Sequence, residues 1–421
     1  MGKRRLTTVK NSSSLNSPVL GSQHEISLAE TDLFSMVPYQ QSVLRSYWSV
    51  FYPETGSLVS TNPDISFNIG PSPHCSNLAN SFIRLEVQLT KEKDPQKQAD
   101  TDEIKAADKV CPANFVAASL FKDIQLYISG KPIASNYGLS YYEAYIRMLT
   151  QLSHDAMNKW ELAGYYPDRI MTQIDGTAVT DPAIHKRYQR FGLGQKQVIY
   201  CPIFTPMAFQ TRLIPSLVDL KLVYTKGPET WQFFCPANNN AKFHMKILDA
   251  QLHVQRTVLY PARARELESK LNSGQQCRFF IENSYLRYFP LDSGTKNFRV
   301  ANILLNSYLP QHIYFALISL KDLKGLKNVS NFNFAHYKLS ALSVRSGENV
   351  WPKNGPFKPT YTDDPDTSIY AREFFSLYSD SLGGLAMKAD SGLALSYKAY
   401  HQGSCVYKID FQRNEDVSLI G

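Results

Sequence analysis

The chain has 421 residues, with 45 Lys and Arg, 37 Asp and Glu, and a formal net charge of +8. Its length suits two domains of about 200 residues, each large enough to bury a core. The modest charge is spread along the chain, so composition alone does not indicate a nucleic-acid-binding protein. Aromatic residues make up 12% of the sequence, and 23 Pro and 21 Gly interrupt short apolar runs. This profile is typical of loop-rich β-sandwiches.

The first part of the chain predicts an arm followed by strands. Residues 1–30 are rich in Ser, Asn and Thr, begin with the basic run MGKRR, and are expected to form a flexible basic arm. A solvated tail is the favoured interpretation of the arm, and contact with a packaged genome is the alternative. After it, LRSYWSVFYPE predicts a first strand. SFNIG, bounded by Pro63 and Pro71, predicts a short edge strand or an extended loop. Ser81–Thr90 alternates apolar and polar residues as a strand does.

The block from Leu120 to Leu149 combines a strand, a glycine turn and a helix. Apolar residues alternate up to Ile128, Gly130 makes the turn, and tyrosines follow at helical spacing. Residues 163–195 read as a long insertion. Further strands are expected at QVIYCPIF, LVDLKLVYT and FHMKILDAQLHVQRTVL. In the last of these the apolar phase changes near Ala250, as a bulge or a bend between two strands would produce.

The remaining sequence predicts a connector and a second unit. Residues 261–274 begin with Pro261 and end at Gly274, as a short helix does. The second unit opens with QCRFFIENSYLRYFPL, continues through NFRVANILLNSYLP and HIYFALISL, and reaches a looser copy of the first block. In this copy Leu342 and Val344 alternate with polar residues, Gly347 makes the turn, and SIYAREFFSLY supplies the aromatic helix.

The two copies lie about 220 residues apart, which indicates duplication of one β-rich unit. After its aromatic helix, the second copy has only CVYKIDF and a polar tail, so roughly 60 residues of strands are missing if the copies are equal. The missing strands predict a truncated chain, completion by another polypeptide, or a reduced second domain. The expected domains are a 1–30 arm, a first unit at 31–260, a connector at 261–274 and a second unit at 275–421.

The sequence contains no recognisable set of catalytic residues. The chain has no G-x-S-x-G elbow, Walker loop, H-E-x-x-H or dinucleotide-binding glycine motif, so no enzyme activity and no cofactor are expected. Asp363–Asp366 lacks the spacing of a calcium loop and reads as a solvated turn. His154 beside Asp155 and His336 beside Tyr337 favour structural roles. The aromatic helices suit a plug of the sandwich end or a subunit contact better than a base-stacking platform.

The six cysteines lie far apart and include no C-x-x-C pair, so free, mostly buried thiols and no metal site are predicted, in a protein folded in a reducing compartment. The longest apolar run, residues 313–320, is too short to span a bilayer.

Several ordered landmarks resemble the major capsid protein of the Polinton/Maverick elements and their adintovirus relatives. A run like SFIRLEVQL precedes a strand that begins Leu120-Phe121-x-Asp123, and a Y-x-A-Y helix follows at Tyr142–Tyr145. Further along come a Lys-Ile-Leu-x-Ala strand, a Leu-Pro pair before the apolar run at 313–320, and an N-F-x-F-x-H-Y segment at Asn331–Tyr337. The likeness covers roughly residues 75–410 and excludes the basic arm.

The resemblance implies an all-β fold called a double jelly-roll. This fold has two antiparallel eight-stranded β-sandwiches with few short helices in loops, and in this chain the second lacks its last strands. The resemblance also implies a homotrimer that forms a pseudo-hexagonal capsomer. Neighbouring capsomers and a penton or minor capsid protein complete an icosahedral shell around double-stranded DNA, and no catalytic residue is carried over. The expected location is the virion, assembled in the nucleus or cytoplasm of a host cell.

Three aromatic residues in the first long loop are candidate interface anchors, because aromatic side chains carry much of the binding energy of protein interfaces. They are Trp160, Tyr165 and Tyr166. Two alternatives remain open at this stage, a minor capsid or penton-type protein and a carbohydrate-active jelly-roll protein. The first is disfavoured by the two-unit length. The second needs a converging pair of carboxylates, which the sequence does not place.

Overall fold

The computed structural model describes residues 42–411 of the chain, apart from 55–63, 93–102, 134–137, 155, 168–180, 236–238, 240, 280, 282–283, 304–309, 326–329 and 382–391. The predicted basic arm, residues 1–30, therefore lies outside the described residues. So do part of the 163–195 insertion and Asp155 of the His154–Asp155 pair.

The first unit contains two four-stranded antiparallel sheets. In one the spatial order is β1 (Val43–Phe51), β10 (Phe243–Leu259), β3 (Cys75–Lys91) and β7 (Lys196–Pro202). In the other it is β2 (Asp64–Ile69), β8 (Leu220–Lys226), β5 (Phe121–Ile128) and β6 (Lys131–Pro132). Apart from the β5–β6 hairpin, the chain changes sheet with every strand of this set. Eight strands wound in this order make a jelly-roll.

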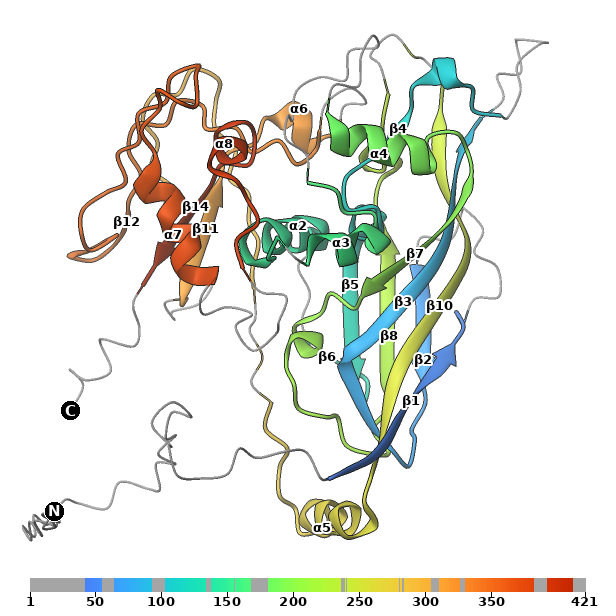
Figure 1. Cartoon of the computed structure of the whole chain (residues 1–421). Coiled ribbons are helices and arrows are strands. Elements are labelled where there is room, and N and C mark those ends of the chain that lie inside the picture. The colour runs from blue at the N-terminus through green and yellow to red at the C-terminus, as the bar shows by residue number, and fades with distance from the viewer. Residues whose placement is uncertain are drawn as a thin grey trace, which may run out of the picture. The chain divides into compact units, whose positions relative to one another are not determined.

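The long strands β3 and β10 run side by side and build the inner face of the first sheet (Figure 1). Ile83, Leu85 and Val87 point into the core, whereas Arg84 and Glu86 between them are only partly buried. This period of two is the one that the sequence predicted for an antiparallel strand with one face buried. A bulge at Ile247/Asp249 shifts the register of β10 beside Ala250, so the predicted phase change is a bulge within one strand.

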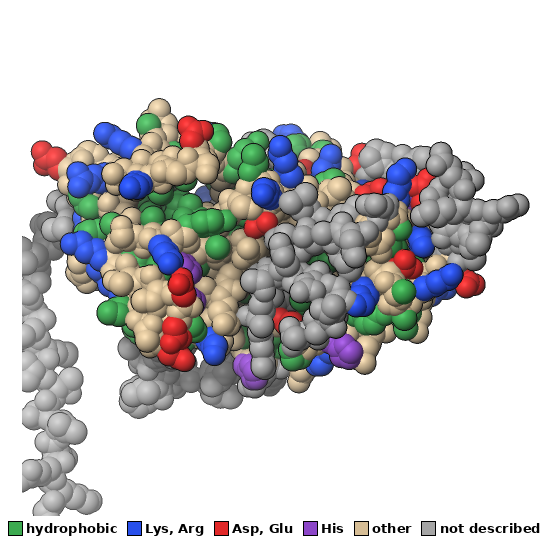
Figure 2. Space-filling model, turned by 90° about the horizontal axis from the view of Figure 1, so that it is seen from above, with side chains coloured by type: hydrophobic (Ala, Val, Ile, Leu, Met, Phe, Trp, Pro, Cys, Tyr) green, Lys and Arg blue, Asp and Glu red, His purple; other side chains and the backbone are tan. Residues whose placement is uncertain are grey.

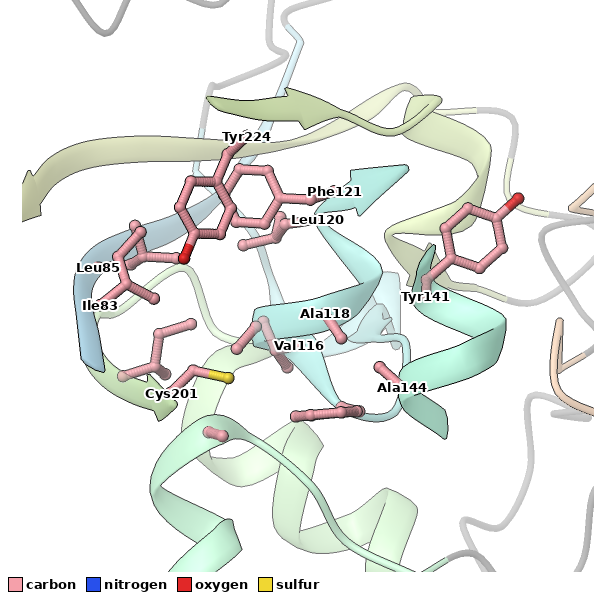
Figure 3. Packing of buried hydrophobic residues seen from close by; sticks show 14 of the residues in the cluster. Ile83, Leu85, Val116, Ala118, Leu120, Phe121, Tyr141, Ala144, Cys201 and Tyr224 are labelled. Carbon is pink, nitrogen blue, oxygen red and sulfur yellow. The ribbon is translucent and has the colours of Figure 1, made fainter. Parts of the chain in front are cut away.

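The second sheet closes the core from the other side. Phe121 at the start of β5 packs on Tyr224 of β8, with ring centroids 4.9 Å apart. Figure 3 shows these rings together with Ile83, Leu85 and Cys201, which come from the first sheet. Fully burying one such side chain contributes roughly 1.5–3 kcal/mol. The predicted edge strand at SFNIG is confirmed, since β2 pairs only with β8 among the described strands.

Short helices fill the connections of the first unit. The aromatic helix α2 spans Ser140–Gln151, and the turn before it uses Gly130 with a φ of 76°, as predicted. The insertion contains an unpredicted helix, α4 (Pro182–Phe191), which Asp181 caps by accepting a hydrogen bond from the Ala183 N–H at 2.8 Å. The other elements are α1 (Val116–Ser119), α3 (Met157–Trp160), β4 (Cys111–Pro112), β9 (Phe233–Phe234) and the 3-10 helices η1 (Ala106–Asp108), η2 (Glu161–Ala163), η3 (Pro206–Phe209) and η4 (Glu229–Trp231).

After β10 the chain forms the predicted helix, α5 (Pro261–Asn272), with Gly274 just past its end at a φ of 81°. The strands expected next are not found: residues 284–303 form neither helix nor strand. The later elements are β11 (His312–Ala316), α6 (Leu320–Leu323), β12 (Val344–Ser346), β13 (Asn349–Trp351), α7 (Ala371–Ser381), α8 (Tyr397–His401) and β14 (Val406–Asp410).

Two two-stranded sheets form in the second half, β11 with β14 and β12 with β13. The β12–β13 hairpin turns at Gly347, with a φ of 59°, so the echo of the first block is present as a hairpin followed by the helix α7. A second apolar core lies here. It consists of Trp351, Phe357, Tyr361, Tyr370, Leu377, Tyr400, Cys405, Tyr407, Ile409 and Phe411.

Two glycines with left-handed backbone allow a matched test of packing. A Cβ at Gly164 would lie 2.7 Å from Cγ2 of Val116, whereas a Cβ at Gly130 would meet nothing within 4 Å. Both positions have a positive φ, so Ala costs about 1–2 kcal/mol at either one. We expect Gly164→Ala to lose about 1–3 kcal/mol more than Gly130→Ala, measured by urea unfolding. Equal losses would contradict the close packing of Gly164 on α1.

Candidate assembly site

The helix α2 and the segment Asn331–Phe334 form an aromatic cluster, which we call the aromatic junction. Tyr145 of α2 stacks on Phe332, with ring centroids 4.0 Å apart and an angle of 14° between the planes. Tyr142 meets Phe332 edge-on at 5.9 Å. Trp231, at the end of η4, packs on Tyr142 at 5.1 Å and on Phe332 at 6.0 Å. Residues far apart in the sequence are thus joined through rings.

Hydrogen bonds fix the geometry of the aromatic junction. The Tyr142 hydroxyl donates to the Asn331 carbonyl at 3.2 Å, and the Asn331 side-chain amide donates to the Trp231 carbonyl at 3.2 Å. Burial raises the pKa of Tyr141 to about 12 and that of Tyr142 further, so both hydroxyls stay protonated donors at neutral pH. Since all of these rings are buried in the apolar core, they favour the plug interpretation over a platform for stacked bases.

Of the three predicted interface residues, Tyr165 packs on Tyr145 of the aromatic junction, with ring centroids 6.3 Å apart. The side chains of Tyr165 and Tyr166 are buried, and Trp160 is partly buried. Phe115 meets Trp160 edge-on at 6.1 Å and Tyr165 at 5.8 Å. In the described part of the chain, the Trp160 indole N–H is buried and has no hydrogen-bond partner. Within one chain these three side chains therefore pack inward and hold the loop against its neighbours. Their role in an interface between chains stays a prediction.

Polar contacts hold the same loop to α4. The Asn114 carboxamide oxygen accepts hydrogen bonds from the N–H of Phe115 at 2.8 Å and of Tyr166 at 2.9 Å. Arg190 donates to the Tyr166 hydroxyl at 3.2 Å. Sequence reasoning missed this support, since neither Asn114 nor Arg190 belongs to a periodic pattern.

The second aromatic helix serves the second core. Tyr370, next to α7, stacks on Tyr397 at 4.1 Å and donates a hydrogen bond to the Tyr397 carbonyl at 2.9 Å. Phe374 meets Tyr400 edge-on at 5.7 Å, whereas Phe375 is 63% exposed. Both predicted aromatic helices thus pack inward, as the plug interpretation requires.

His336 lies among aromatic rings of this region and has a lowered pKa. Its ring stacks on Tyr361 at 4.2 Å and lies 4.6 Å from the ring of His401. Its Nδ1 accepts a hydrogen bond from the Lys338 N–H at 3.0 Å. Burial, helped by His401 and Lys338 and opposed by Asp363, lowers the pKa of His336 to about 4. The ring is therefore neutral at pH 7 and serves a structural role, as the sequence favoured.

The other residues singled out in the sequence have ordinary surroundings. The Asp363 side chain is 93% exposed and lies 2.9 Å from the Lys338 ammonium, so the acidic segment is a solvated turn. Five cysteines are buried and free, and Cys277 is exposed and free. Among the described residues, no three His, Cys, Asp or Glu side chains gather as metal ligands do, and no helix is long and apolar enough to cross a bilayer.

Charge is distributed without a single dominant patch on the face seen from above the sandwich. In the coloured part of Figure 2, Lys and Arg side chains lie scattered among uncharged side chains, with Asp and Glu beside several of them. A surface that binds nucleic acid through its phosphates concentrates basic residues instead.

No protein-family model matches the chain. The uncharacterized protein F54H12.2 of Caenorhabditis elegans is 23% identical to it over 320 residues, which cover 73% of each protein. Similar solved structures include the Sputnik virophage, with a TM-score of 0.40 and 12% identity over 59% of this chain and 54% of the other. The Faustovirus major capsid protein has a TM-score of 0.37 and 9% identity over 57% and 58%.

The mavirus major capsid protein has a TM-score of 0.36 and 10% identity over 60% of this chain and 54% of its own. The chain thus spans a little over half the length of each of these solved structures. Two of these three structures are named as major capsid proteins.

The aromatic junction predicts a large difference between two aromatic truncations. Tyr145→Ala removes a fully buried ring that stacks on Phe332, so we expect it to lower the free energy of unfolding by about 3–5 kcal/mol. The control Phe375→Ala removes an exposed ring from the other aromatic helix and should change stability by less than about 0.5 kcal/mol. Urea unfolding measures both, and similar losses would contradict the plug.

The lowered pKa of His336 predicts that stability falls in mild acid. The neutral ring is favoured in the folded state, so its contribution is complete above pH 6.5 and is lost as the pH falls toward about 4. We expect a loss on the order of 1–2 kcal/mol, because solvent screens a half-buried ring. His336→Phe keeps a stacked ring but cannot take up a proton. In this variant the free energy of unfolding, measured by urea unfolding at a series of pH values, should change less between pH 6.5 and 4. An unchanged pH dependence in this variant would exclude His336 as its source.

Proposed function

We propose that the chain is a major capsid protein that assembles with copies of itself into the shell of a double-stranded DNA virus or virus-like element. The observation that carries the proposal is the strand order of the first unit, β1-β10-β3-β7 facing β2-β8-β5-β6. This order is that of a jelly-roll sandwich, and it occurs in a chain whose sequence landmarks resemble the capsid proteins of Polinton/Maverick elements. The landmarks at Tyr142, Tyr145 and Asn331 are also residues of the aromatic junction.

The finer architecture belongs to the same proposal. We infer a double jelly-roll with a first sandwich at 31–260, a connector at 261–274 and a second unit at 275–421. Supporting it are the helix α5 at the expected connector and the repeated order of strand, glycine turn and aromatic helix. In this arrangement the aromatic junction fixes the second unit to the first, because Phe332 and Phe334 belong to the same apolar core as the sandwich.

Assembly follows from the same inference. Three chains form a pseudo-hexagonal capsomer, and neighbouring capsomers and a penton or minor capsid protein complete an icosahedral shell located in the virion. The protein then acts by building surfaces and not by catalysis. The basic arm, residues 1–30, is the proposed contact with packaged DNA, since it holds the one basic cluster of the sequence.

Solution mass and particle formation test the proposal. The full chain is purified and measured by size-exclusion chromatography with light scattering, and its assemblies are viewed by negative-stain electron microscopy. We expect a species of three times the 47.7 kDa chain mass, or closed shells. A monomer at all concentrations that forms no shells would overturn the assignment, and specific glycan binding by such a monomer would favour the carbohydrate-binding alternative.

The interface role of Trp160 has its own test. We propose that its exposed edge contacts a neighbouring chain, while the buried rings of Tyr165 and Tyr166 hold the loop. Trp160→Ala should weaken trimers strongly while lowering the unfolding midpoint only a little. The control is Tyr166→Phe, which removes only a hydroxyl bonded to Arg190 and should leave trimers intact. Trimers that resist Trp160→Ala, or that fail only in step with the fold, would contradict the interface role.

A further inference from the structure

The strand β1 has an open edge with apolar side chains on both faces. Among the described residues it pairs only with β10, and no hydrogen bond reaches its other edge. Leu44 is 52% exposed, Trp48 53% and Val50 42%. Such an edge is a template for pairing with another chain unless charges, proline or a cover block it. Arg45 is the only charged residue in β1, and the strand contains no proline.

The other three edges of the sandwich are protected. The carbonyl of Ser66 in β2 accepts the Glu54 N–H at 2.8 Å, and the carbonyl of Val198 in β7 accepts from Arg190 at 3.1 Å. The edge strand β6 has two residues, Lys131 and Pro132, so it offers little to pair with. The exposure of β1 is therefore a property of this edge and not of the sandwich in general.

The outer face beside this edge is aromatic. Trp48 packs on Phe82 of β3 at 6.2 Å, and Phe82 stacks on His253 of β10 at 4.7 Å and meets Tyr200 of β7 at 5.8 Å. A stripe of rings thus crosses all four strands and ends at the open edge. Added strands extend such a stripe, because the same face continues across a paired edge.

Two copies of β1 can pair with each other in antiparallel orientation with compatible side chains at the positions that lie opposite each other. Antiparallel pairing about a two-fold axis at Tyr47 is the register that matches all nine residues, from Val43 to Phe51. It places Trp48 opposite Ser46 and Arg45 opposite Ser49, so these two long side chains each meet a serine and the two arginines stay apart. Leu44 then lies opposite Val50, which covers two exposed apolar side chains.

We propose that β1 pairs with β1 of a second copy of this chain, antiparallel about a two-fold axis through Tyr47, which joins two four-stranded sheets into one of eight strands. The contact is isologous, with the same surface on both partners. It does not depend on the capsid assignment. A chain that also forms trimers through other surfaces would use this contact to link one trimer to the next.

Cross-linking of the full chain tests the register. In a Cys277→Ser background, which removes the exposed native thiol, Tyr47→Cys should form a disulfide-linked dimer under copper-phenanthroline oxidation. Ser49→Cys alone and Arg45→Cys alone should not cross-link, because each lies four residues out of register with its own copy. A mixture of the two variants should cross-link, because residues 45 and 49 lie opposite each other.

Charge substitution supplies the second readout. Tyr47→Lys sets two ammonium groups opposite each other on the axis and should weaken self-association about tenfold or more by analytical ultracentrifugation. Tyr200→Lys, at a site of similar exposure on the far edge strand of the same sheet, is the matched control and should leave association unchanged.

Several outcomes would overturn the proposal. They are no cross-link at position 47, equal cross-linking of Ser49→Cys alone, and equal effects of the two lysine variants. A cross-link at position 47 that appears only after removal of residues 1–41 would also overturn it, since it would assign the edge to the chain's own N-terminal segment. If shells or trimers form but position 47 does not cross-link, the β1 pairing is wrong and the capsid assignment is unaffected.

Discussion

The pairing of β3 with β10 is the constraint on which the rest of the sandwich depends. Each strand has 17 residues, and the ladder runs from Phe243 opposite Lys91 to Thr257 opposite Cys75. A slip of one residue would turn every apolar side chain of a strand toward solvent, so the buried set fixes the register. A bulge in β10 at Ile247/Asp249 and a second irregularity, where residues 78–81 of β3 lie between the paired residues Asn77 and Phe82, adjust the ladder without losing that set. Both β1 and β7 are added to this pair, one on each side.

The aromatic junction extends the sandwich core to residues that are distant in sequence. Tyr142 and Tyr145 lie on α2 of the first unit. They contact Asn331 and Phe332, which belong to the second half of the chain. A ring stack alone tolerates sliding, but the hydrogen bonds from Tyr142 and Asn331 point in fixed directions. Packing supplies most of the stability of this contact, and the hydrogen bonds define one arrangement. The helix is thus a connecting element as well as a plug.

Sequence patterns predicted the first unit well because its strands are half-buried. Alternation marks β3 and β10 clearly, since one face of each meets the core and the other meets solvent or polar neighbours. The same patterns failed at residues 284–303, where no partner strand is present among the described residues. The helix α4 was missed because it lies in a polar insertion. Burial of Tyr165 and Tyr166 was also beyond reach, since it depends on Asn114 and Phe115, which are distant in sequence.

The second half is stabilised by rings where the first is stabilised by strands. A sheet of two strands is marginal in water, and β11 is only partly buried along its whole length. Its partner β14 is buried because Tyr407 joins the cluster of Tyr361, Tyr400 and Cys405 beneath it. The extended segment 284–303 approaches β11 through a side chain, since Phe298 stacks on Phe315 at 6.2 Å, and not through a backbone ladder.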